Sequence, residues 1–181
     1  WIPCDPSLAI RRSLFMNEAG RSLAVVAATF IALLGVMAWG LGFLADRRHH
    51  PNSGIESGVT GPSEVVLQAN PIGQYVVPGE INGEGVTFLV DTGATHVAVP
   101  ASVADRIGLE RGADIAVETA GGRTRASSVV LDRVVIGGIV RHDVRGTINP
   151  AMSGDEVLLG MTFLRGIELR QQGDRLFLRA G

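Results

Sequence analysis

The sequence has only one cysteine, no lysine and few aromatic residues. A single cysteine, Cys4, excludes an intramolecular disulfide and argues against a metal site built from cysteines. All 16 basic residues are arginines, the formal net charge is −2, and aromatic residues make up 5% of the chain. This composition lacks the basic stripe of a nucleic-acid-binding protein. We therefore expect no nucleic-acid partner, and the sequence points to no metal ion or other cofactor.

A long uncharged segment lies near the start of the chain. No charged residue occurs from Ser22 to Ala45, and a helix needs roughly 20 apolar residues to cross the hydrocarbon core of a bilayer. Trp39 lies toward one end, where an interfacial indole ring is favoured. A cleaved signal peptide is the alternative, but its apolar region usually has about 7–15 residues. The length favours a transmembrane anchor over residues 21–45, preceded by an N-terminal tail over residues 1–20.

The charges on either side of this segment indicate its orientation. It is preceded by Arg11, Arg12 and Arg21 and followed by Arg47 and Arg48. Positively charged flanks tend to stay in the cytoplasm. The bias of three arginines against two therefore predicts a cytoplasmic N-terminus, with the rest of the chain outside the cytoplasm.

The segment after the anchor has the composition of a linker. Residues 46–63 are rich in Gly, Ser and Pro and show no apolar periodicity. Such a composition predicts a flexible tether. His49 and His50 lie in it, but no third ligand is near them in the sequence, so we interpret them as solvated side chains.

Short apolar runs separated by glycine turns occupy residues 64–181. The glycine turns predict three hairpins, and residues 100–109 are predicted to form a short helix with Gly108 at its C-terminal end. Many short strands with regular turns indicate an all-β, barrel-like domain. The predicted strands are 65–67, 74–77, 86–90, 115–119, 125–131, 134–136, 139–144, 167–170 and 175–179.

One aspartate directly follows an apolar strand. Residues 88–95 read FLVDTGAT, so Asp91 is expected at the rim of the core. A carboxylate is costly there unless it is paired or hydrogen-bonded. On the motif alone, two explanations stay open. Asp91 either caps a turn through backbone N–H groups, or it serves as a catalytic carboxylate.

The wider context of Asp91 resembles the retropepsin family of aspartic proteases. In that family the D-T-G loop is followed, late in the domain, by two apolar residues and a glycine that lead into a short helix. Residues 158–160, LLG, fit this pattern, and the predicted hairpin at 120–123 lies where the family has its flap. The resemblance covers about residues 72–179. Within the family, the chain is most similar to the bacterial membrane-anchored members.

This resemblance implies a fold and a location. The fold is an all-β, acid-protease β-barrel lobe with one or two short helices, preceded here by a single transmembrane helix. The bacterial members of this kind have one transmembrane helix and a periplasmic protease domain. We therefore expect a single-pass protein of the inner membrane whose protease domain, residues 64–181, lies in the periplasm.

The resemblance also implies a homodimer that hydrolyses peptide bonds in a protein or peptide substrate. Such catalysis needs two carboxylates that share one proton, and this sequence has a single D-T-G. Two chains would therefore meet with Asp91 facing Asp91 across a twofold axis. Gly93 is expected to donate its N–H to the carboxylate, and Thr92 to hydrogen-bond across the dimer. Ala94 stands where pepsin-like enzymes carry serine.

Two further groups of residues take roles from the resemblance. The first is the tip of a flap, a hinged hairpin that closes over substrate and excludes water; an ordinary β-turn is the alternative. The second packs beneath the aspartate loop in a structural role. The flap residues are Ala120, Gly121 and Gly122, and the supporting residues are Leu158, Leu159 and Gly160.

Other function classes have less support. No phosphate-binding loop and no serine nucleophile elbow appear in the sequence. The main alternative is a catalytically inactive, membrane-tethered module of the same fold that binds peptides or dimerises, with Asp91 in a structural role. The sequence favours a membrane-anchored aspartic endopeptidase. Its activity should fall steeply on dilution as dimers separate, whereas a binding module would bind without turnover.

Overall fold

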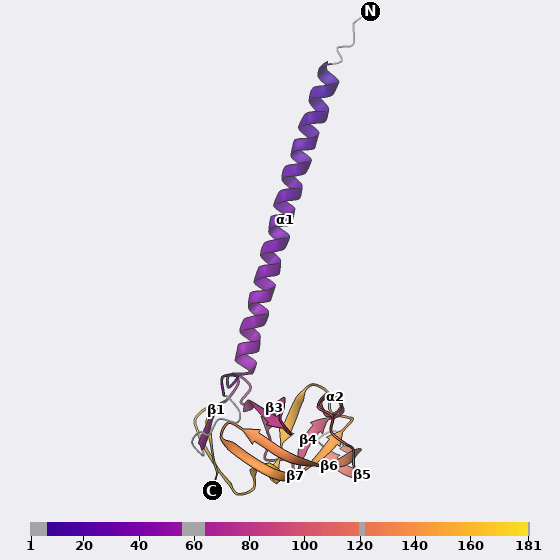
Figure 1. Ribbon diagram of the computed structural model, residues 1–181. Coiled ribbons are helices and arrows are strands. Elements are labelled where there is room, and N and C mark those ends of the chain that lie inside the picture. Colours follow the sequence, from indigo (N-terminus) through magenta and orange to yellow (C-terminus); the bar gives the residue numbers. More distant parts are fainter. Residues whose placement is uncertain (1–6, 56–63, 120–121, 181) are drawn as a thin grey trace, which may run out of the picture. The chain divides into compact units, whose positions relative to one another are not determined.

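The computed structural model describes residues 7–55, 64–119 and 122–180. The chain forms two compact units, one ending at Asp46 and the other beginning at Arg47. The first unit is helical, and the second is rich in β-strands (Figure 1).

Helix α1 spans Ser7–His49. Its segment Ala27–His49 has a mean hydropathy of 2.0 and is long enough to cross a membrane, although a signal sequence passes the same test. The large apolar side chains in this segment are exposed, and Trp39 and Phe43 stack with their ring centroids 6.1 Å apart. The helix extends beyond both ends of the predicted span. It ends just before His50, the residue that precedes Pro51, because proline disfavours helical geometry in the residue before it.

The second unit consists mainly of strands, which confirms the expected all-β class. Two short helices interrupt the strands, in agreement with the expectation of one or two. The strands are β1 (Glu64–Gln68), β2 (Val76–Ile81), β3 (Glu84–Val90), β4 (Val97–Pro100), β5 (Asp114–Thr119), β6 (Gly122–Ile136), β7 (Ile139–Asn149), β8 (Glu156–Leu159), β9 (Ile167–Gln172) and β10 (Arg175–Ala180), and the helices are α2 (Ala101–Arg106) and α3 (Met161–Leu164).

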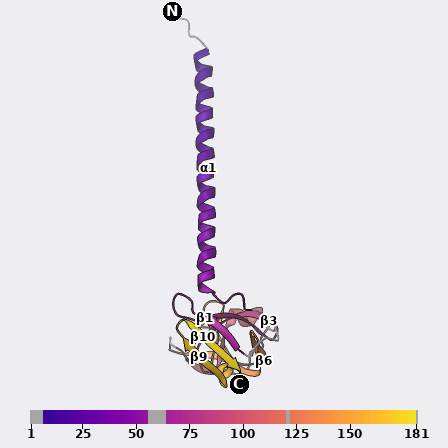
Figure 2. The ribbon, with the colours of Figure 1, turned by 90° about the vertical axis from the view of Figure 1, so that its left-hand side faces the viewer.

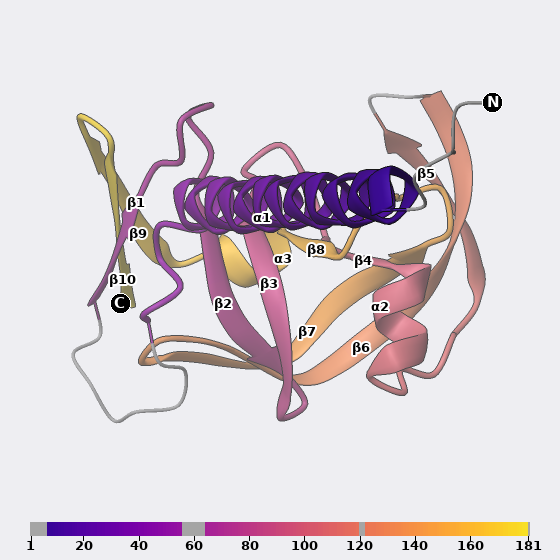
Figure 3. The ribbon, with the colours of Figure 1, turned by 90° about the horizontal axis from the view of Figure 1, so that it is seen from above.

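The strands form two sheets. A three-stranded antiparallel sheet has the order β1-β10-β9, and these strands lie side by side in Figure 2. A seven-stranded sheet has the order β2-β3-β8-β4-β7-β6-β5, and an extra pairing of β2 with β6 closes it into a barrel-like structure. The small sheet lies at one end of the domain, and α2 and β5 lie at the other (Figure 3).

The core lies inside this barrel-like structure. Phe88, Leu131, Leu159 and Phe163 are all fully buried there. The close crossing of β2 and β6 depends on Gly79, because a Cβ atom there would lie 2.4 Å from Val135 O and 2.6 Å from the Phe88 ring. No side chain fits at that distance, so the crossing needs glycine.

Several element boundaries differ from the sequence-based expectation. The predicted helix 100–109 ends at Arg106, and Gly108 follows with φ +69°. The predicted strands 125–131 and 134–136 form one long strand, β6, because both pair with the same partner, β7. Strands β4 and β8 were not predicted. Each takes a parallel partner from a distant part of the chain, and that pairing leaves no local signal.

Part of the predicted linker is attached to the domain. Asn52 is buried, and its Nδ2 donates hydrogen bonds to Gln68 O (2.9 Å) and Val76 O (2.7 Å). The Gln68 N–H donates in turn to Asn52 Oδ1 at 2.7 Å. These bonds fasten the chain to the end of β1 and the start of β2 within a few residues of helix α1. Residues 56–63 lie outside the described residues.

Candidate active site

Strand β3 delivers Asp91 to the edge of the core. Its apolar residues pair in parallel with β8, with Val90 opposite Leu159. The Asp91 N–H extends this pairing by donating to Leu159 O at 3.2 Å. The strand then ends, and the Asp91 side chain is half-buried at the point where the chain turns away.

The turn after Asp91 is held by Asp91 itself. The Gly93 N–H donates to Asp91 Oδ1 at 2.9 Å, and the Ala94 N–H donates to the Asp91 backbone oxygen at 3.3 Å. This is the geometry of an Asx turn. Among the described residues, Gly93 is the only hydrogen-bond donor to this carboxylate. Its second oxygen therefore keeps its lone pairs for another partner. Thr92 is exposed at the tip of the turn.

Helix α3 supports the loop from below. The Met161 N–H donates to Ala94 O at 2.8 Å, and the Thr162 N–H donates to Thr95 O at 3.1 Å. These two backbone bonds satisfy N–H groups of a helix start, which otherwise lack partners within the helix. They tie the segment that carries Asp91 to the segment that follows β8.

The Thr162 side chain adds a second tie that sequence reasoning missed. Its hydroxyl accepts a hydrogen bond from the Val97 N–H (3.0 Å) and donates one to Arg145 O (2.7 Å). It thereby bridges the start of β4 and the middle of β7. A threonine in a short helix gives no local signal of such a role, because both partners come from other parts of the chain.

The three residues expected beneath the loop do not lie in one layer. Leu159 is fully buried in the core. Gly160 lies directly against the loop, where a Cβ atom would be 2.2 Å from His96 O and 2.7 Å from Ala94 O. Leu158 points the other way and lines the cleft that contains Asp91. This difference follows from the strand, because successive side chains point to opposite faces.

Asp91 opens into a cleft of about 1220 Å³. One wall comes from the loop, with Asp91 and residues 93–96, and the other from the β5–β6 hairpin, with residues 116–119 and 122–124. In the hairpin Thr119 lies opposite Gly122, and Thr119 Oγ1 donates to Gly122 O at 2.8 Å. Gly122 has φ +105°. The predicted flap residues Ala120 and Gly121 lie outside the described residues.

The cleft carries both apolar and charged groups. Ala98, Met152 and Leu158 line it, together with Glu118 and Arg123, which lie opposite each other on the hairpin. In the described part of the chain, no group of three or more His, Cys, Asp or Glu side chains has the arrangement of a metal site. Asp91 presents a carboxylate to this cleft.

Two likenesses place this arrangement among known proteins. The family model for the aspartyl protease of gag polyproteins matches residues 77–166, which include Asp91, the hairpin and Gly160. A crystal structure of a retropepsin-like aspartic protease from Rickettsia conorii superposes with a TM-score of 0.52 and 25% sequence identity. That likeness covers 69% of this chain and 92% of the other. The chain belongs to the retropepsin-like family.

This retropepsin-like chain also has a relative among curated proteins. It is 37% identical over 123 residues to an uncharacterized protein in the cobV 5′ region of Sinorhizobium sp. The match covers 66% of this chain and 53% of the relative, so the chain spans about half the length of that protein. The family resemblance drawn from the D-T-G and LLG motifs is thus confirmed, and so is the expected fold.

Proposed function

We propose that this chain is an aspartic endopeptidase that acts as a homodimer, with two Asp91 carboxylates flanking one water molecule. The observation that carries this proposal is the Asp91 side chain itself. It opens into a large cleft with one oxygen held by Gly93 N–H and the other oxygen free of protein donors among the described residues. A retropepsin-like chain with one D-T-G supplies only one of the two carboxylates that the reaction needs.

The reaction follows from two adjacent carboxyl groups that share one proton. The ionised group takes a proton from the water while the water oxygen attacks the peptide carbonyl carbon. The protonated group gives its proton to the carbonyl oxygen, which forms a neutral tetrahedral diol. The dyad then gives a proton to the peptide nitrogen and takes one from a diol hydroxyl as the C–N bond breaks, which leaves a carboxyl and an amine. The dyad ends with one proton, as it began.

The neighbouring residues fit this scheme. Gly93 holds the carboxylate, and Thr92, exposed at the tip of the turn, is suited to contact its equivalent across the twofold axis. The hairpin of β5 and β6 is proposed as the flap, since its described residues line the cleft opposite Asp91. Gly160 keeps the loop and helix α3 in close contact.

Helix α1 is proposed to anchor the protein in the inner membrane, with the domain in the periplasm. Its apolar length and exposed side chains support an anchor. Confinement of two chains to one membrane surface raises their effective concentration, and that would favour the dimer.

The test uses the full chain in detergent with a mixed peptide pool, at high and low protein concentration. We expect cleavage that falls faster than linearly on dilution and that disappears in Asp91→Asn. The matched control is Asp143→Asn, because Asp143 is exposed, lines no cleft, and has φ +54°, which asparagine also adopts. Equal cleavage by both variants, or none by the wild type, would instead favour a tethered module in which Asp91 only holds the turn.

A further inference from the structure

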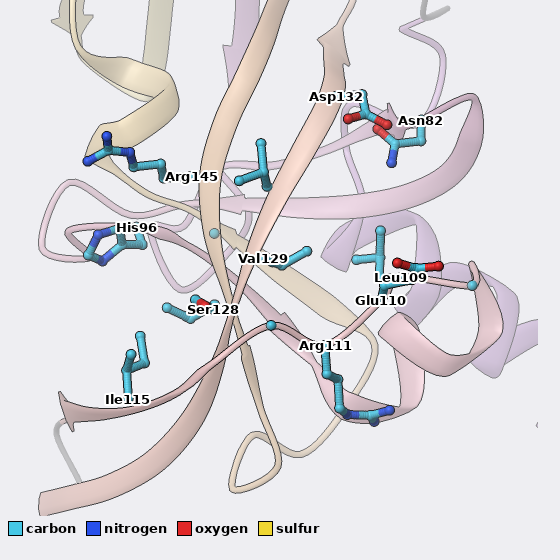
Figure 4. Close-up of a pocket in the computed structure, with 15 residues that line it drawn as sticks. Asn82, His96, Leu109, Glu110, Arg111, Ile115, Ser128, Val129, Asp132 and Arg145 are labelled. Carbon is cyan, nitrogen blue, oxygen red and sulfur yellow. The ribbon is translucent and has the colours of Figure 1, made fainter.

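A second hollow adjoins the cleft. Its volume is about 740 Å³, and Figure 4 shows the side chains that line it. His96 and Thr147 line both the hollow and the cleft of Asp91, so the two spaces meet at these residues. A peptide lying in the cleft can therefore extend a side chain or its own continuation into the hollow.

Two basic residues lie at this end of the hollow: His96, which lines both spaces, and Arg145, which lines the hollow two residues before Thr147. Strands β4 and β7 are parallel neighbours, with Val97 opposite Gly146. His96 and Arg145 each come one residue earlier, on adjacent chain segments that the Thr162 hydroxyl bridges through Val97 N–H and Arg145 O. Both line the hollow, and Figure 4 shows both on the same side of it.

These two side chains have no partner in the described part of the protein. Arg145 is exposed and its guanidinium makes no ion pair there, whereas Arg111 of the same hollow pairs with Asp105 at 2.7 Å. The acidic residues of the hollow, Glu110 and Asp132, lie on the opposite side from His96 and Arg145 in Figure 4. The end of the hollow beside the cleft is thus basic and unpaired.

We propose that this hollow is an additional substrate subsite that accepts an acidic side chain of the peptide, bound between His96 and Arg145. A guanidinium binds a carboxylate through two parallel N–H···O bonds, and a neutral amide lacks the charge that strengthens them. The inference rests on the proposed protease function and deepens it, since it names a feature of the substrate. Because a homodimer repeats the hollow by its twofold axis, one acidic position is expected on each side of the scissile bond.

The experiment compares peptides that differ only by Glu or Gln at one position, scanned along a cleaved sequence. Full-length protein is assayed for kcat/KM, and the Asp91→Asn protein is assayed for binding by fluorescence polarisation with the same peptides. We expect Glu to be preferred by about twofold to fivefold, the upper part of the range for one ion pair at a partly exposed site. The preference should shrink as ionic strength rises.

Variants of Arg145 test whether this side chain causes the preference for Glu. Arg145→Gln should bring the ratio of kcat/KM for the Glu peptide to that for the Gln peptide down to about one. Arg145→Lys should retain part of the preference, because lysine keeps the charge without the fork geometry. Arg175→Gln is the matched control, since Arg175 is exposed on the three-stranded sheet and lines neither space. It should keep the ratio of the wild type.

The two assays separate this inference from the proposed function. Equal use of Glu and Gln at every position, or a preference that survives in Arg145→Gln, would overturn the subsite. If the wild type cleaves no peptide, the protease proposal fails, and the binding assay still decides the inference: a Glu preference that Arg145→Gln removes would support it, and equal binding would overturn it.

Discussion

Replacement of Gly160 by alanine tests the packing that holds the Asp91 loop. The new Cβ atom would lie 2.2 Å from His96 O and 2.7 Å from Ala94 O. Neither oxygen moves freely, because both belong to the backbone and Ala94 O accepts the Met161 N–H at 2.8 Å. Relief of the clash requires the loop and helix α3 to separate.

The cost of this separation can be estimated from two contributions. Overpacking in a tight site costs about 1–3 kcal/mol, and each lost backbone hydrogen bond adds about 1 kcal/mol. With the bonds from the Met161 and Thr162 N–H groups both weakened, we expect Gly160→Ala to lower the free energy of unfolding by about 3 kcal/mol. For a domain of this size, such a loss lowers Tm by roughly 10 °C.

The assay is differential scanning calorimetry of the full chain, combined with hydrogen exchange at the Met161 and Thr162 amides. Gly85→Ala is the matched control, because Gly85 has no atom within 4 Å of an added Cβ and no positive φ. It should change stability by less than about 0.5 kcal/mol. Equal Tm values for Gly160→Ala and Gly85→Ala, with unchanged exchange at both amides, would refute the reasoning.

Three more changes have expected outcomes. Asn52→Ala leaves buried backbone groups without partners, so it should lower the free energy of unfolding by about 2–3 kcal/mol and speed proteolysis of residues 47–55. Ser53→Ala, at an exposed position, is the control and should do neither. Thr162→Val removes the hydroxyl between β4 and β7 and should cost about 1–3 kcal/mol by urea unfolding; Thr162→Ser should restore most of it. Ala94→Ser adds a donor beside Asp91 that stabilises the ionised carboxylate, so the acid limb of the pH–rate profile should move to lower pH; an unchanged or higher limb would contradict this.

The local structure around Asp91 was predictable because its signals are local. An apolar run, an aspartate and a glycine in direct succession specify a buried strand that ends in an Asx turn, and residues 88–93 adopt that structure. The hairpins were predictable for the same reason, since glycine turns between apolar runs are read from neighbouring residues. The flap role of the first hairpin and the dimer stay predictions.

Long-range contacts account for what was missed. Asn52 lies in a stretch of linker composition, yet it is buried because unpaired backbone groups at Gln68 and Val76 lie within its reach. Thr162 is a similar case, since both partners of its hydroxyl come from other strands. A side chain that satisfies distant backbone groups leaves no periodic pattern of its own.

By itself the sequence determined the all-β class, the apolar helix and the D-T-G loop, because side-chain periodicity and turn chemistry act between neighbouring residues. Only the tertiary structure decided that Leu158 lines the cleft while Leu159 enters the core, and that His96 and Arg145 line one hollow. Those outcomes depend on the parallel pairings of β3 with β8 and of β4 with β7. Such pairings join distant segments, and their register is set by the packing of the whole core.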